Sequence, residues 1–418
     1  MVRKSLVWLH RWTGLLMAGF LIVEGLTGAL LVYRVPLERW LAPQLFAVAR
    51  PGIAQLPLAE LATRAERSLP QARIAYFWLE ERQAIVRVLP RVDQSTGKAY
   101  ELDFDHLYLD PWSGRELGRR REGDLSQGMI NLVPFIYQIH MSLAAGELGA
   151  LALGVVALAW TIDCFVGFYL TLPVARTRFL RRWRPAWRIK LPASGVRSNF
   201  DLHRAGGLWL LPLLFVFGWS SVMFNLQRVY QPVTRALLDY QDDMELVGKF
   251  HLRRNSSPRL GWSAAQSAGQ RLLAQQALSH GFSVGRPYGM AYIEEWGVYT
   301  YSAMSSANVQ AHGWGTSVWI DGNSGALIST DFPQRQHSGN TVETWLRALH
   351  FADLRDSALY RVTVFVVGLA TVMLSVTGVY LWWKKRKARL HRPSLRRARS
   401  AEALLGERGG WLNRPGQT

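Results

Sequence analysis

Cysteine is almost absent from this sequence, which has a single one, Cys164, among 418 residues. One cysteine cannot build a disulfide framework within the chain, and no Cys-x-x-Cys-His motif is present for covalent haem attachment. No Gly-x-Gly-x-x-Gly motif follows an expected strand, which argues against a dinucleotide site within the chain. The sequence therefore gives no sign of a disulfide-stapled fold, a covalently attached haem or a nicotinamide site.

Acidic residues are also scarce, with 30 Asp and Glu against 49 Lys and Arg and a net charge of +19. Three stretches hold 23 of the 49 basic residues and only three acidic ones: the first eleven residues, residues 176–204 and the tail after Trp383. Cytoplasmic loops of membrane proteins are enriched in Lys and Arg, so we expect both termini and the 176–204 loop in the cytoplasm. Nucleic-acid binding is then the weaker explanation of the charge.

Four long apolar runs are present, and most approach the roughly 20 residues that cross a bilayer. They are Val7–Tyr33, Leu148–Leu172, Leu208–Phe224 and Ala358–Trp383. The third is short unless it begins at His203. The first is too long for a signal peptide, contains Glu24 and lacks a small-residue cleavage site, so we expect an uncleaved anchor. These runs predict a four-span protein of the bacterial inner membrane.

The first and third runs are related in sequence. An ungapped comparison of His10–Gly28 with His203–Ser221 gives seven identities in nineteen positions, including the His-Arg pair and two glycines. The second and fourth runs each follow a histidine, His140 or His350, and end in similar Gly-aromatic or Gly-Val-Tyr sequences. We expect His140 to begin one continuous helix that reaches Thr171. The pattern predicts one structural plan used twice.

A hydrophilic region precedes the second and the fourth run. Each closes on Asp, then Ser-Gly, between alternating apolar residues, which predicts a hairpin at Asp110–Gly114 and another at Asp321–Gly325. Earlier in each region we expect a helix and then a strand pair: Leu58–Ser68 before Ile74–Trp78 with Ala84–Leu89, and Ser263–Leu278 before Gly289–Ile293 with Gly297–Ser302.

The predicted fold is an internally duplicated four-transmembrane-helix bundle with two periplasmic α+β domains. We expect transmembrane helices at residues 1–34, 131–174, 200–226 and 344–384, periplasmic domains at 35–130 and 227–343, a cytoplasmic basic loop at 175–199 and a cytoplasmic basic tail at 385–418.

Four histidines occupy matched positions in this topology. His10 and His203 begin spans near the cytoplasmic face, whereas His140 and His350 precede spans near the periplasmic face. Two imidazoles per face, from different spans, suit axial ligation of a haem iron. Zinc needs three or four converging ligands, so two per face are too few. The alternative is that each histidine is a satisfied or solvated side chain.

Other residues near these histidines are candidates for supporting roles. Gly14 and Gly207 lie one turn beyond His10 and His203, where a small residue lets a porphyrin lie against the helix. The neighbouring Arg11 and Arg204 could pair with haem propionates.

Two acidic residues lie within the expected spans. Asp163 could accept the outer N–H of a ligating histidine, and Glu24 could gate protons or hold a partner. Each could equally be a neutral, hydrogen-bonded residue of the bundle. We expect the remaining histidines of the hydrophilic regions on the surface: His106, His251, His280, His312 and His337.

The order of these motifs resembles a known family. Leu9-His-Arg-Trp-Thr-Gly-Leu15, its echo Leu202-His-Arg-Ala-Gly-Gly-Leu208, the two Asp-x-x-Ser-Gly turns and the histidines before the second and fourth spans resemble the PepSY-associated transmembrane helix family. That family includes iron-regulated inner-membrane proteins and periplasmic ferric-siderophore reductases. The likeness extends to about Arg389; Trp12 stands where the echo has Ala205, and the basic tail beyond Leu390 has no counterpart.

The resemblance implies two PepSY-like domains, two b-type haems and one-electron reduction of ferric siderophore in the periplasm. By position, the axial ligands would be His10, His140, His203 and His350. The electron donor would be quinol or a partner protein. The alternatives are a haem-free PepSY module that senses, inhibits or scaffolds, and a siderophore-uptake accessory without redox activity.

Overall fold

The computed structural model describes residues 1–190, 194–242, 254–313, 315–334, 336–355 and 357–409, with side chains up to residue 390. The chain divides into two compact units. The first unit comprises Met1–Gly25, Ala159–Phe215 and the chain from Leu369 onward, and the second comprises Leu26–Leu158 and Val216–Gly368.

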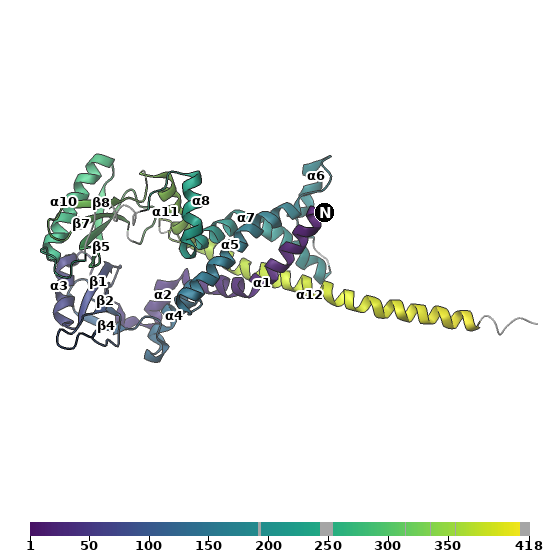
Figure 1. Cartoon of the computed structure of the whole chain (residues 1–418), viewed down its shortest axis with the longest axis horizontal. Helices are drawn as coiled ribbons and strands as arrows, with labels where there is room; N and C mark the ends of the chain where they lie inside the picture. The colour runs from purple at the N-terminus through teal and green to yellow at the C-terminus, as the bar shows by residue number, and fades with distance from the viewer. Residues whose placement is uncertain (191–193, 243–253, 314, 335, 356, 410–418) are drawn as a thin grey trace, which may run out of the picture. The chain divides into compact units, whose positions relative to one another are not determined.

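Four helices of the described residues are long and apolar enough to cross a membrane (Figure 1). They are α1 (Val2–Leu31), α5 (Gly146–Thr171), α7 (Gly195–Asn225) and the segment Ala358–Leu390 of α12 (Ala358–Gly409). Because α7 begins at Gly195, the third span includes His203 and is not short. The expectation of a multi-pass membrane protein with four spans is confirmed.

The helix expected from His140 to Thr171 is interrupted. His140 lies on a separate helix, α4 (Leu132–Ser142), and the chain turns at Leu143 and Ala144 before α5 begins. Both turn residues have positive φ, 54° and 52°, a conformation that ends a helix and that non-glycine residues seldom adopt. His350 likewise ends its own helix, α11 (Ser338–His350), ahead of α12.

One antiparallel sheet of eight strands lies in the second unit, with the order β4-β3-β2-β1-β5-β6-β7-β8. Its strands are β1 (Ala72–Leu79), β2 (Ala84–Pro90), β3 (His106–Leu109), β4 (Glu116–Arg120), β5 (Val284–Ile293), β6 (Val298–Ser305), β7 (Thr316–Asp321) and β8 (Leu327–Asp331). The sequence predicted two separate α+β domains. Instead, β1 pairs with β5, so that both hydrophilic regions contribute four strands to one sheet.

Helices α3 (Leu58–Ser68) and α10 (Trp262–His280) cover one face of this sheet (Figure 1). The apolar side of α3, which includes the fully buried Leu61, packs in one core with Leu273 of α10 and with Phe77 and Tyr301 of the strands. α3 has the bounds expected from the sequence, and α10 is longer than expected by one residue at its start and two at its end.

Both hairpin turns have the predicted chemistry. The carboxylate of Asp110 accepts hydrogen bonds from the backbone N–H groups of Trp112 and Ser113, and Gly114 has φ +65°. Asp321 accepts the backbone N–H groups of Asn323 and Ser324. Gly325 then has φ +75°, which favours glycine.

The remaining described helices are short. They are α2 (Arg34–Leu41), η1 (Pro43–Leu45), η2 (Leu125–Gln127), η3 (Met129–Asn131), α6 (Phe179–Trp183), η4 (Arg184–Trp187) and α8 (Gln227–Leu237). α2 and η1 lie at the second face of the sheet, where Leu45 packs against Ile85 and Tyr108.

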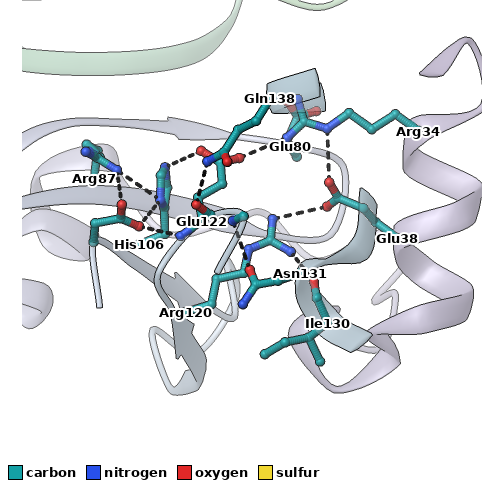
Figure 2. A network of polar contacts seen from close by, with 12 residues as sticks. Arg34, Glu38, Glu80, Arg87, His106, Arg120, Glu122, Ile130, Asn131 and Gln138 are labelled. Carbon is teal, nitrogen blue, oxygen red and sulfur yellow. Dashed lines mark hydrogen bonds and ion pairs between the residues drawn. The ribbon is translucent and has the colours of Figure 1, made fainter. Parts of the chain in front are cut away.

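A polar network joins this face to α2 and α4 (Figure 2). Glu38 of α2 accepts hydrogen bonds from Arg34 at 3.0 Å and from the buried Arg120 at 3.4 Å. His106, which we expected on the surface, is only 3% exposed, and its Nδ1 lies 2.7 Å from a carboxylate oxygen of Asp105. That prediction was wrong because burial of a strand residue depends on which elements cover the sheet.

Candidate functional site

The first unit brings His10 of α1 and His203 of α7 together. Their ring centres lie 6.1 Å apart and the ring planes are inclined at 58°. The Nδ1 of His10 donates to the carboxylate of Asp163 on α5, with distances of 3.0 and 2.9 Å to its two oxygens. The Nδ1 of His203 donates to the carbonyl oxygen of Leu374 at 3.0 Å and also lies 3.2 Å from the hydroxyl of Thr377.

The second unit contains the other pair with nearly the same geometry. The ring centres of His140 and His350 are 6.1 Å apart, and their planes are inclined at 56°. The Nδ1 of His140 lies 3.0 Å from the hydroxyl of Thr27, and the Nδ1 of His350 lies 2.7 Å from that of Ser220. Three aromatic rings pack around His350: Phe217, Phe224 and Phe351. Burial lowers the pKa of His350 to about 3, which keeps its imidazole neutral.

Both pairs have a ring separation that would accommodate one metal ion between the two imidazoles. Two metal–imidazole bonds of roughly 2 Å, with about 1 Å more from each nitrogen to its ring centre, would place the rings about 6 Å apart. In all four histidines the Nδ1 atom faces a protein oxygen. If these rings bind a metal, Nε2 would be the ligating atom of each, since a ligating histidine usually donates its other N–H to a protein acceptor.

A cavity of about 430 Å³ opens beside the first pair. Its lining includes both histidines, Asp163 and the two glycines expected to leave room, Gly14 and Gly207. An added Cβ at either glycine would meet none of the described atoms within 4 Å, so there is space for a flat ligand against both helices. The other lining residues are mostly apolar, which suits a porphyrin.

Cationic side chains line the same cavity: Arg3, Arg11, Arg204 and Lys385. Arg204 is held by the carboxylate of Asp201 at 2.8 Å, and Arg3 donates to the carbonyl oxygens of Leu170 and Leu172. Positive charge beside a largely apolar cavity fits the two carboxylates of a haem, which would be held by charge-assisted hydrogen bonds.

Three further glycines contact the histidines, and the sequence did not assign them this role. A Cβ built on Gly28 would lie 2.9 Å from Cε1 of His140, and one on Gly378 would lie 3.2 Å from Cε1 of His203. The corresponding distance from Gly167 to His10 is 3.6 Å. The matched Gly-aromatic and Gly-Val-Tyr sequences contained the signal for Gly167 and Gly378, but no sequence feature marked Gly28.

The sheet fixes both helices that carry the second pair. On α4, the amide of Gln138 donates to the backbone oxygen of Glu122, at the end of the first hairpin. Beyond His350, the carboxylate of Asp353 accepts the backbone N–H and the Nδ1–H of His312, at 2.9 and 3.0 Å. Each histidine of this pair is therefore positioned through its own half of the sheet.

Glu24 and the histidines of the hydrophilic regions lie outside the two histidine pairs. Glu24 is half-buried on α1. His280 and His312 are exposed, as expected, whereas His337 is half-buried and pairs with Asp239 at 2.8 Å. His251 lies outside the described residues. Within the described part of the chain, no group of three or more His, Cys, Asp and Glu side chains could hold a metal ion.

Comparison with known proteins gives a family and a distant relative. The model of the PepSY-associated TM region matches residues 7–385, nearly the whole chain. An uncharacterized protein of Pseudomonas aeruginosa is 26% identical over 276 residues, which cover 60% of this chain and 63% of the relative, less than two thirds of its length. With its four membrane helices, its antiparallel sheet domain and this match, the chain belongs to the family of the PepSY-associated TM region.

Proposed function

We propose that this protein is a di-haem b electron carrier of the bacterial inner membrane that reduces ferric siderophore iron in the periplasm. One haem would lie between His10 and His203, and the other between His140 and His350. The observation that carries the proposal is the repeated pair, with ring centres 6.1 Å apart in each unit. Two independent pairs, each with room for one metal ion between its rings, favour ligation over four unrelated half-buried histidines.

Different residues of the first cavity would ligate the haem iron, orient the ligating rings, leave room for the porphyrin and pair with its propionates. When bound, haem supplies a one-electron couple of its iron at each site. The Nε2 atoms of His10 and His203 would ligate, while Asp163 and the carbonyl of Leu374 fix the orientation of the rings. Gly14 and Gly207 leave room, and Arg11 and Arg204 would pair with the propionates.

The substrate follows from the resemblance to ferric-siderophore reductases. Siderophores hold ferric iron more tightly than ferrous iron, so transfer of one electron to the chelate would release Fe(II). Quinol or a partner protein would supply the electron, in keeping with the lack of a dinucleotide motif. The second pair would pass the electron to the ferric chelate, since the sheet that positions His140 and His350 would lie in the periplasm, where the chelate would dock.

A haem-free function is the second candidate, because the sheet domain is a large part of the chain by itself. In that case the protein would sense, inhibit or scaffold other proteins, or assist siderophore uptake without redox chemistry. An absorption spectrum of the purified protein separates the classes. A Soret band with a reducible α band supports electron transfer, and the absence of both supports the haem-free function.

The acceptor can be tested with dithionite-reduced protein freed of excess reductant. On mixing with a ferric siderophore, we expect the α band to decay while a ferrous chelator captures Fe(II) at one equivalent per electron lost. His140→Ala, which removes a proposed ligand, should slow this reaction strongly, whereas His280→Ala at the exposed end of α10 should not. Reoxidation by oxygen but by no ferric siderophore would contradict the proposed substrate.

A further inference from the structure

We infer that the segment of residues 172–190, which follows the second membrane span, binds the headgroups of anionic phospholipids. The segment runs from the end of α5 through α6 and η4, and its sequence contains no acidic residue. The inference does not rest on the haems, because it concerns an outer surface of the first unit. Such contacts would hold the end of α5 and the start of α7 at the charged border of the bilayer.

The charge of the 172–190 segment is entirely positive. Its seven cationic side chains are all exposed: Arg176, Arg178, Arg181, Arg182, Arg184, Arg188 and Lys190. Among the residues that the structure describes, none of the seven forms an ion pair with an acidic side chain. The next acidic residue of the chain, Asp201, is already paired with Arg197 and Arg204. The seven charges therefore need anionic partners from outside the chain.

Ring contacts and hydrogen bonds hold the segment against the last turn of α5. The indole Nε1 of Trp183 donates to the hydroxyl of Thr171 at 3.2 Å. The ring of Trp183 also meets that of Phe168 edge-on, with 5.8 Å between the ring centres. On the side of α7, Arg204 donates to the carbonyl oxygen of Pro185 at 2.7 Å. The cations are therefore carried by a folded segment with a defined place beside the span.

These contacts place the segment at the border of the bilayer. α5 has 26 residues, which at 1.5 Å per residue extend over about 39 Å, more than the roughly 30 Å of hydrocarbon. With the hydrocarbon centred on this helix, its last turn reaches the headgroup layer. Tryptophan rings prefer that layer, where the ring meets acyl chains and the N–H meets polar groups. Trp183 is held at this depth by its contacts with Phe168 and Thr171.

Two apolar side chains of the segment are exposed among the cations. Val174 is 81% exposed and Leu180 is 69% exposed. At a membrane surface such side chains enter the acyl border, while the neighbouring arginines stay with the phosphates. An acidic protein would match the charge alone. The exposed apolar side chains and the position at the end of a span favour lipid as the partner.

The ligand chemistry is a phosphate diester with a net negative charge on a diacyl lipid. The guanidinium fork of arginine donates two parallel hydrogen bonds to phosphate oxygens. Each cation near the surface contributes about fivefold to the preference for an anionic membrane. Phosphatidylcholine carries the same phosphate, but its choline cancels the charge. It is therefore the matched neutral lipid for phosphatidylglycerol, which has no such cation.

The test is native mass spectrometry of the purified full chain equilibrated with phosphatidylglycerol and phosphatidylcholine in equal amounts. We expect the wild-type protein to retain phosphatidylglycerol in preference to phosphatidylcholine. Arg181→Gln combined with Arg182→Gln should lower this preference by about fivefold for each charge removed. Arg259→Gln combined with Arg271→Gln, which removes two exposed arginines of the second unit, should leave the preference unchanged.

Equal retention of both lipids by the wild-type protein would leave the arginines to water or to a protein partner, and it overturns the inference. An equal loss of preference in the two double variants also overturns it, because the effect would then come from net charge alone. Should the double variant at Arg181 and Arg182 fail to fold, Arg181→Gln by itself carries the test, with about a fivefold loss expected.

Discussion

The contacts of the histidines show how closely single residues constrain the candidate site. Gly28 faces the ring of His140, where a Cβ would come within 2.9 Å of Cε1. That separation is too short for a carbon pair, so a methyl group would push the imidazole away from its partner His350. The 6.1 Å separation in the second unit therefore depends on a residue with no side chain.

We predict that Gly28→Ala removes haem from the His140–His350 site and leaves the other site loaded. The haem content should fall to about one per chain, measured by the pyridine haemochrome assay on purified protein. Gly19→Ala on the same helix is the control, because a Cβ there meets none of the described atoms within 4 Å. Equal haem content in both variants would show that Gly28 does not position His140.

Single site residues could be predicted from the sequence where the first half of the chain could be compared with the second. The order of the spans, together with the duplication, indicated which histidines pair, and the structure brings His10 to His203 and His140 to His350. The contact of Gly28 with His140 could not be predicted, because it joins residues 112 positions apart on helices whose rotation only packing decides. His106 was misplaced for a similar reason, since α2 and η1 bury its strand.

Among the elements, the hairpin turns give the clearest link from sequence to stability. Asp321 accepts two backbone N–H groups and the hydroxyl of Ser324. Burial by itself would raise the pKa of Asp321, but the hydrogen bonds from Ser324 and Asn323 together outweigh it and lower the pKa. The folded state thus favours the ionised form at neutral pH.

We predict that Asp321→Ala lowers the free energy of unfolding by about 1 kcal/mol, the usual value of such hydrogen bonds. Asp321→Asn, which keeps an acceptor oxygen, should lose less. The charge contributes fully above the ordinary aspartate pKa of about 3.9 and is lost as the pH falls through the lowered folded value. The gap in apparent Tm between wild type and Asp321→Asn should therefore close on acidification; a gap that widens would contradict this sign.

The elements that sequence reasoning missed are those set by tertiary contacts. Turns follow local rules, and the Asp and Gly residues of both hairpin turns were predicted, whereas the strand bounds differ from the expected ones by up to five residues. The β1–β5 pairing joins strands about 200 residues apart, and no local pattern specifies a partner at that distance. The break after α4 falls at Leu143 and Ala144, two residues with no preference for positive φ, so nothing local indicated that His140 lies on its own helix.

At the scale of the whole molecule, the second histidine pair and the sheet belong to the same compact unit. Gln138 and Asp353 tie the histidine-bearing segments to the two halves of the sheet. The same plan, a histidine with an oxygen acceptor behind Nδ1, appears in both compact units. The proposed function requires this repetition, because each unit would hold one haem between its own two histidines.

The measurement that tests this most directly is the haem count per chain in wild type and in two single variants, by pyridine haemochrome and protein mass. We predict two in wild type and one in each of His203→Ala and His350→Ala, with each variant retaining the absorption of the site that the other has lost. Unchanged counts in both variants, or no haem in the wild-type protein, would contradict the assignment of the histidine pairs as axial ligands.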